Sequence, residues 1–127
     1  MQRAASGSRF ETRLPGHAFS TRARLTGSAS FTALLRAKSV ARGARFIVHA
    51  VQNQKSFARL GIIVGKRTVQ HAVARNFLKR LIRETFRAQQ HRLVGYDVLV
   101  RVRRPVARGD ARIAQAELTD LLDAAVA

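Results

Sequence analysis

The chain contains no cysteine, which excludes disulfide bonds and cysteine-based zinc sites. Acidic residues are also scarce: 7 Asp and Glu stand against 24 Lys and Arg, a formal net charge of +17 at pH 7. No apolar run approaches the roughly 18 residues that a membrane-spanning helix needs. Such a basic chain is typical of nucleic-acid-binding proteins, ribosome-like structural proteins and membrane-surface binders. The lack of cysteine also fits a cytoplasmic protein.

The few acidic and histidine residues are scattered along the chain. No pair of carboxylates has the spacing of a two-metal site, the usual device for cleaving a phosphodiester. No glycine-rich phosphate loop follows a predicted strand, because Gly61 and Gly65 lack the required pattern. We therefore expect no catalytic residue, metal site or cofactor site in the protein itself.

Hydrophobic residues make up 46% of the 127 residues, enough for one domain with a modest core. Residues 1–13 are basic and rich in small residues, which predicts a flexible extension before a single domain at 14–127. The hydrophobic pattern predicts the order α-β-β-α-β-α, an α+β fold with helices packed on a small sheet. The expected elements are a helix from Ser28 or Ser30 to Lys38, broken by Gly43; strands at 45–51 and 57–64 around a polar hairpin loop at 52–56; a helix at 71–91; a strand at 96–102; and a last helix after Asp110.

The segment 74–87 is strongly amphipathic when it is wound as a helix. Its apolar face has Phe77 and Phe86 on its flanks. Cations at i,i+4 spacing repel each other, so we expect a polyanion such as RNA or DNA to offset the repulsion. An ordinary solvated face is the alternative, although such faces normally mix charges of both signs. The polar arc spans about 140° and contains Arg75, Asn76, Lys79, Arg80, Arg83 and Arg87.

Two motifs resemble a known family. The sequence GIIVGKR at 61–67, followed by ARNFLKRLIRE at 74–84, is similar to the signature of the bacterial ribonuclease P protein component. The similarity extends over roughly residues 14–123. The family motif usually reads Arg-Asn-Arg, whereas its third position here is Phe77. This departure puts one RNA contact in doubt and leaves the rest of the basic arc intact.

The resemblance implies a subunit of an RNA-based endoribonuclease. In such enzymes an RNA subunit, with Mg²⁺, removes the 5′ leader from precursor tRNA, and the protein binds both that RNA and the leader. We expect one protein per RNA, no membrane partner and a cytoplasmic location. The resemblance also implies a mixed sheet with a left-handed βαβ crossover, although general packing rules favour the right-handed form.

The family's functional residues carry over to two groups in this sequence. Each group has a structural alternative: Phe31 and Phe46 as core residues, His49 as a structural histidine, and Lys66 and Arg67 as a solvated loop. A basic structural RNA-binding protein of ribosomal type is the alternative for the whole chain. The expected RNA-binding residues are Lys66, Arg67, Arg75, Asn76, Lys79, Arg80, Arg83 and Arg87, and the expected leader-binding residues are Phe31, Leu35, Phe46 and His49. Four further arginines either form a second basic patch or only make the end of the sheet more soluble: Arg101, Arg103, Arg104 and Arg108.

Overall fold

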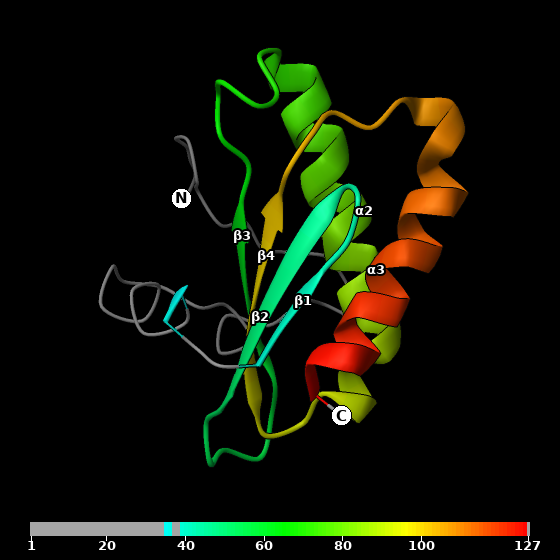
Figure 1. The fold of residues 1–127 in the computed structure, drawn as a ribbon. Coiled ribbons are helices and arrows are strands. Elements are labelled where there is room, and N and C mark those ends of the chain that lie inside the picture. Colours follow the sequence, from blue (N-terminus) through cyan, green and yellow to red (C-terminus); the bar gives the residue numbers. More distant parts are fainter. Residues whose placement is uncertain (1–34, 37–38, 127) are drawn as a thin grey trace.

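Two long helices cover one face of a four-stranded sheet (Figure 1). The structure, a computed structural model, describes residues 35–36 and 39–126. The expected extension at 1–13 lies outside the described residues, as does the expected first helix apart from Leu35 and Arg36. The elements are β1 (Ser39–Arg42), β2 (Phe46–Gln52), β3 (Arg59–Ile63), α2 (Ala72–Gln89), a 3₁₀ turn (Gln90–Arg92), β4 (Tyr96–Val102), a second 3₁₀ turn (Arg108–Asp110) and α3 (Ala111–Val126).

The strands lie in the order β1-β2-β4-β3. β2 runs antiparallel to both of its neighbours, whereas β3 and β4 are parallel. The expected hairpin between the strands predicted at 45–51 and 57–64 is therefore wrong, because β4 lies between β2 and β3. Sequential strands are often neighbours, but the loop between these two crosses the end of β4. There Asn53 N–H donates to the carbonyl of Gly95 at 2.8 Å.

The parallel pair β3 and β4 is joined through α2, which runs along one face of the sheet (Figure 1). This arrangement confirms the predicted α+β class with a mixed sheet. The hand of the crossover stays a prediction from the family resemblance. Gly95 begins the return into β4 with a φ of +88°, a conformation that suits glycine because it has no Cβ.

β1 was absent from the elements predicted by the sequence. It has only four residues, too few for an alternating pattern to stand out. β1 pairs with β2, and Gly43 forms the turn between them rather than a helix end. A Cβ at Gly43 would collide with the Glu117 carboxylate of α3, so a larger residue here would have to displace that side chain.

The core lies between the sheet and the two helices. Alternation along β2 points Phe46, Val48 and Ala50 into it, as the sequence predicts. Ile82 of α2 and Leu122 of α3 are fully buried against the same face. Each helix thus uses its apolar stripe for the core, which leaves the opposite face of α2 for other contacts. Within the described part of the chain, no helix is long and apolar enough to span a bilayer.

Candidate nucleic-acid interface

The loop before α2 presents two cations to solvent. Lys66 and Arg67 are both exposed, as predicted. The carbonyl of Gly65 accepts hydrogen bonds from the N–H groups of Thr68, at 3.2 Å, and Val69, at 2.9 Å. The side chain of Val69 is buried in the core. The loop is therefore a fixed turn that holds its cations beside the start of α2.

Arg75 ties this loop to the helix. Its Nη1 donates to the carbonyls of Val69 and Gln70, both at 2.9 Å. Part of the guanidinium therefore satisfies backbone groups of the loop. Arg75 was predicted as an RNA contact, and the structure gives it a positioning role toward Lys66 and Arg67.

Along α2 the exposed polar face is narrower than the predicted arc. Asn76 and Arg80 are exposed, and Arg83 and Arg87 are half-buried. Lys79 is only 8% exposed, so the prediction that it projects into solvent is wrong. On a helical wheel Phe86 falls between Arg75 and Lys79, and its fully buried ring extends the packed face to that side. We name the remaining set of five cations and one amide the α2 surface: Lys66, Arg67, Asn76, Arg80, Arg83 and Arg87.

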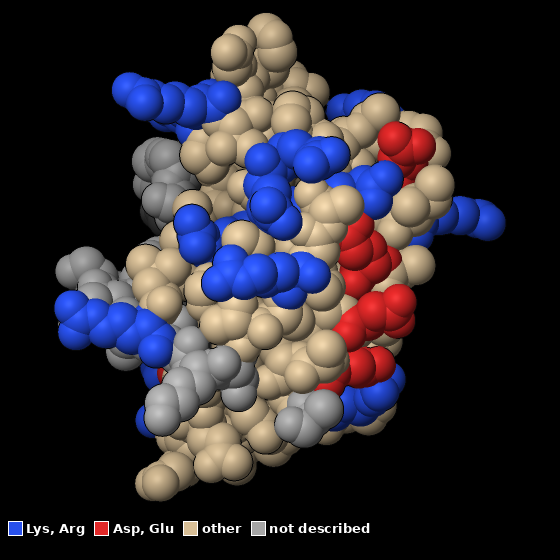
Figure 2. All heavy atoms as spheres, in the orientation of Figure 1, with Lys and Arg blue, Asp and Glu red and all other residues tan. Residues whose placement is uncertain are grey.

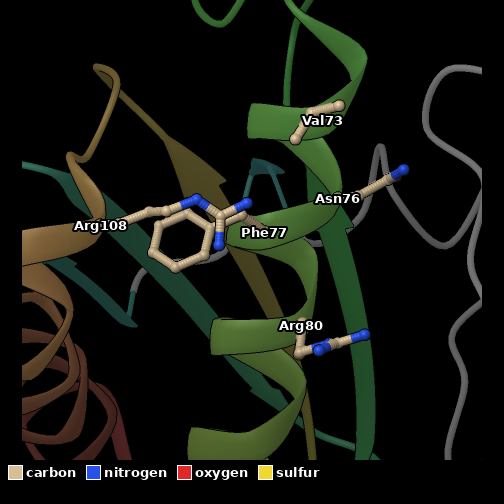
Figure 3. Close-up of a pocket in the computed structure, with 5 residues that line it drawn as sticks. All are labelled: Val73, Asn76, Phe77, Arg80 and Arg108. Carbon is tan, nitrogen blue, oxygen red and sulfur yellow. The ribbon is translucent and has the colours of Figure 1, made fainter.

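Phe77, at the departure from the family motif, is half-buried and packs against the core. The guanidinium of Arg108, from the turn before α3, lies over its ring with Cζ 5.0 Å from the centroid. These two side chains border a surface hollow of about 210 Å³ (Figure 3). Val73, Asn76 and Arg80 complete its lining. No sequence pattern indicates this pairing, because the two residues lie far apart in the chain.

The predicted leader-binding residues do not form one surface. Phe31 lies outside the described residues, and Leu35 is exposed. Phe46 is fully buried in the core between sheet and helices, so it cannot offer its ring to a base. Its prediction as a leader contact is therefore wrong, and its core alternative is right. Strand alternation alone places Phe46 on the face opposite to His49.

His49 lies on the sheet face that points away from α2 and α3. It is 4% exposed, and its two ring nitrogens have no hydrogen-bond partner within residues 35–36 and 39–126. Burial and the positive charges of Arg101 and Arg42 lower its pKa below the usual value of 6.5. The imidazole is therefore neutral and buried near two cations, and its ring is not exposed for stacking with a base.

The sequence prediction missed the pairing of Arg42 and Arg101 on this face. Ile47 lies directly opposite Arg42 on β1 and directly opposite Arg101 on β4. Directly opposed residues point to the same side of a sheet, so the two arginines flank Ile47, two residues before His49. We name Arg42, His49 and Arg101 the sheet surface. To predict the sheet surface, one would need to know that β1 exists and in which order the strands lie. The hydrophobic periodicity of the sequence shows neither.

Most of the acidic side chains on one face of the molecule follow a single helix (Figure 2). In Figure 2, basic side chains gather over the β1–β2 turn and the segment after β4, whereas acidic side chains lie along α3. Two carboxylates of α3 are already paired, Glu117 with Arg45 at 2.8 Å and Asp123 with Arg92 at 2.9 Å. In the part that the structure describes, no three His, Asp or Glu side chains gather as metal ligands.

Comparisons with known proteins agree on one family. The family model described as Ribonuclease P matches residues 19–126. A ribonuclease P protein component from Ralstonia pickettii is 36% identical over 116 residues, which cover 86% of this chain and 83% of that protein. One from Bordetella parapertussis is 42% identical over 94 residues, covering 70% and 76%.

Solved structures give the same answer for the fold. The RNase P protein from Thermotoga maritima is 25% identical, with a TM-score of 0.63 and coverage of 78% of this chain and 94% of that one. The RNase P protein from Staphylococcus aureus, 24% identical, has a TM-score of 0.62 and coverage of 82% and 92%. The second likeness supports the fold alone. Together with the motif on α2 and the family match, these likenesses show that the chain belongs to the ribonuclease P protein family of bacteria.

Proposed function

We propose that this chain binds the RNA subunit of ribonuclease P through the α2 surface. The observation that carries the proposal is the exposure of Lys66, Arg67 and Arg80 on one fixed loop and one helix. Among the described residues none of the three has a carboxylate partner. Folded RNA crowds phosphates together, and cations held on a rigid frame lose little freedom when they bind them.

We further propose that the 5′ leader of precursor tRNA lies across the sheet surface. Arg42 and Arg101 would contact leader phosphates, since a single strand binds best to a cationic groove. His49 would lie beneath them as a neutral side chain, and Leu35 would offer an exposed apolar contact at the margin. This assignment replaces the stacking role predicted for Phe46.

The proposed holoenzyme divides its work between RNA and protein. The RNA subunit, with Mg²⁺, would carry out phosphodiester cleavage, and the protein would hold the two RNAs in register. One protein would bind one RNA subunit in the cytoplasm. The protein's own contribution is then electrostatic and positional, because charge neutralisation lets two polyanions approach each other.

Reconstitution tests the proposal. The protein is mixed with a bacterial ribonuclease P RNA, and removal of the 5′ leader from precursor tRNA is measured at low Mg²⁺, where cation-dependent RNA folding is limiting. We expect the protein to accelerate cleavage strongly. The protein alone is the control and should cleave nothing. Tight RNA binding without any acceleration would contradict the proposal and would favour a structural protein of ribosomal type.

A further inference from the structure

The hollow bordered by Phe77 and Arg108 combines groups that no single element of the fold supplies. In Figure 3, Val73 and Arg80 lie at its two ends, Asn76 lies on one side, and Phe77 with Arg108 lies on the other. Four of these residues come from α2, and Arg108 comes from the turn before α3. The volume of about 210 Å³ is below the usual range for drug-sized ligands, so it suits one small planar group.

Arg108 is held in place at both ends of its side chain. Its backbone lies in a short 3₁₀ turn, in which Asp110 N–H donates to the carbonyl of Ala107 at 2.9 Å. Val106, just before the turn, is buried in the core. At the other end the guanidinium lies over the Phe77 ring, an attraction between a cation and a π-system.

A guanidinium placed over a ring keeps its N–H donors available, because they lie in the guanidinium plane rather than on its faces. Arg108 is exposed, as is Arg80 on the other border of the hollow. Neither forms an ion pair with a carboxylate of residues 35–36 or 39–126. Two unneutralised cations that border one hollow favour an anionic ligand.

The remaining lining suits a nucleobase. Val73 is 68% exposed and is an apolar side chain on an otherwise polar face of α2. Its methyl groups offer a contact for the face of a base, and the Asn76 amide can donate to and accept from a base edge. An acidic peptide would use the two cations but would leave this apolar contact unused.

We propose that the hollow binds one unpaired nucleotide of the RNA subunit, with Arg108 on its phosphate and its base against Val73 and Asn76. The inference rests on the proposed function, because it names a contact within the same RNA complex. Phe77 then acts as a positioning residue. Phe77 occupies the position where the motif usually has arginine. Its ring holds the Arg108 guanidinium there, so Arg108 provides the positive charge that the motif arginine would otherwise provide.

Titrations of the full chain with a bacterial ribonuclease P RNA test the proposal. Arg108→Ala should weaken binding about five- to tenfold and lower the salt slope by roughly 0.7 to 0.9. The matched control is Arg112→Ala, an exposed arginine of α3 outside the hollow, which should change binding less than twofold. Equal effects of the two variants would overturn the proposal, because they would show a response to net charge alone.

A double-variant comparison tests the role of Phe77. Phe77→Leu keeps an apolar side chain but removes the ring, so binding should weaken about two- to fivefold. In the Arg108→Ala background the same change should add almost nothing. Phe77→Arg combined with Arg108→Ala should restore binding to near the original level. Independent, multiplicative effects would contradict the positioning role.

A second measurement needs no variant. Titration with 5′-AMP, followed by NMR, should shift the backbone amides of Asn76, Phe77 and Arg108 before others. Shifts elsewhere on the molecule, or none at these three residues, would overturn the hollow as a nucleotide site. If the unaltered protein binds ribonuclease P RNA no better than another structured RNA of equal length, the proposed function fails. The 5′-AMP titration then still decides whether the hollow takes a nucleotide.

Discussion

At the scale of single residues, His49 has an unusual environment. It is buried, its ring nitrogens are unpartnered within the described residues, and two arginines lie close enough to affect its titration. A buried polar group without a hydrogen bond costs stability, and a third positive charge, on the ring beside Arg42 and Arg101, would cost more. The folded protein therefore binds a proton at His49 less readily than the unfolded chain does.

This lowered pKa predicts a pH dependence of stability. Above the unfolded value of about 6.5, His49 is neutral in both states and adds no penalty. As the pH falls through that value toward the lower folded pKa, the unfolded chain gains a proton that the folded chain does not, so the free energy of unfolding decreases. His49→Leu should remove this decrease, which urea unfolding at about pH 7.5 and 5.5 can measure.

The exposed His91 provides the control for this measurement. His91→Gln should leave the pH dependence as it is in the unaltered protein. A loss of the dependence in His91→Gln, or its persistence in His49→Leu, would show that the titrating group is elsewhere.

Residue types were easier to predict than residue exposure. Helical periodicity identified the cations of α2, but it placed Lys79 in solvent, although Phe86 falls between Arg75 and Lys79 on the same wheel. Strand alternation separated Phe46 from His49, and only the family resemblance placed both at the leader. The partnership of Phe77 with Arg108 depends on how the turn before α3 passes α2, which is a tertiary property.

At the scale of elements, Glu117 joins α3 to the β1–β2 turn. Its carboxylate accepts hydrogen bonds from Arg45 N–H at 2.8 Å, Phe46 N–H at 3.3 Å and Arg45 Nη1 at 2.8 Å. Burial on its own would raise the pKa of Glu117, but these hydrogen bonds and the Arg45 charge outweigh it, and the pKa is lowered. The ionised carboxylate therefore stabilises the folded state at neutral pH, and this contribution is lost as the pH falls through the folded pKa.

Substitution of Glu117 should loosen this corner of the fold. We expect Glu117→Gln to lower the free energy of unfolding by about 1–2 kcal/mol, because charge-assisted hydrogen bonds become neutral ones and one acceptor is lost. Such a change corresponds to a melting temperature lower by roughly 4 °C per kcal/mol in a domain of this size. Thermal unfolding followed by circular dichroism measures it.

Asp120→Asn, at an exposed position of the same helix, is the matched control and should change the melting temperature little. Gly43→Ala should act like Glu117→Gln, since its Cβ would displace the same carboxylate. Equal melting temperatures for Glu117→Gln and Asp120→Asn would contradict the role assigned to Glu117.

The long elements of this fold were predictable and their arrangement was not. The helices α2 and α3 and the strand β4 have clear periodicity and punctuating residues, and the structure confirms them near the expected bounds. β1 is too short to signal itself, and the insertion of β4 between β2 and β3 depends on contacts between distant segments. The sheet surface depends on both β1 and this strand order, so it could not be predicted from the sequence.

At the scale of the whole molecule, the net charge is +17, and part of the excess of Lys and Arg lies on two separate surfaces. The α2 surface lies on the helical side of the sheet, and the sheet surface lies on the other side. Self-repulsion of this size disfavours the compact state and is relieved by polyanions, so binding and folding are expected to reinforce each other. Two surfaces on opposite sides allow the protein to contact two RNAs at once.

The central claim is that two separate surfaces of the protein bind two different RNAs. It is tested most directly by measuring two affinities for the same pair of variants. Arg80→Ala should weaken binding of the RNA subunit about fivefold, as expected for one lost charge-assisted contact, and lower its salt slope. Arg101→Ala should leave that affinity unchanged, but it should weaken binding of precursor tRNA to the assembled complex about fivefold. The loss should vanish when the tRNA lacks a leader. If both variants weaken both affinities alike, or if the Arg101→Ala effect persists without a leader, the account of two separate RNA surfaces is contradicted.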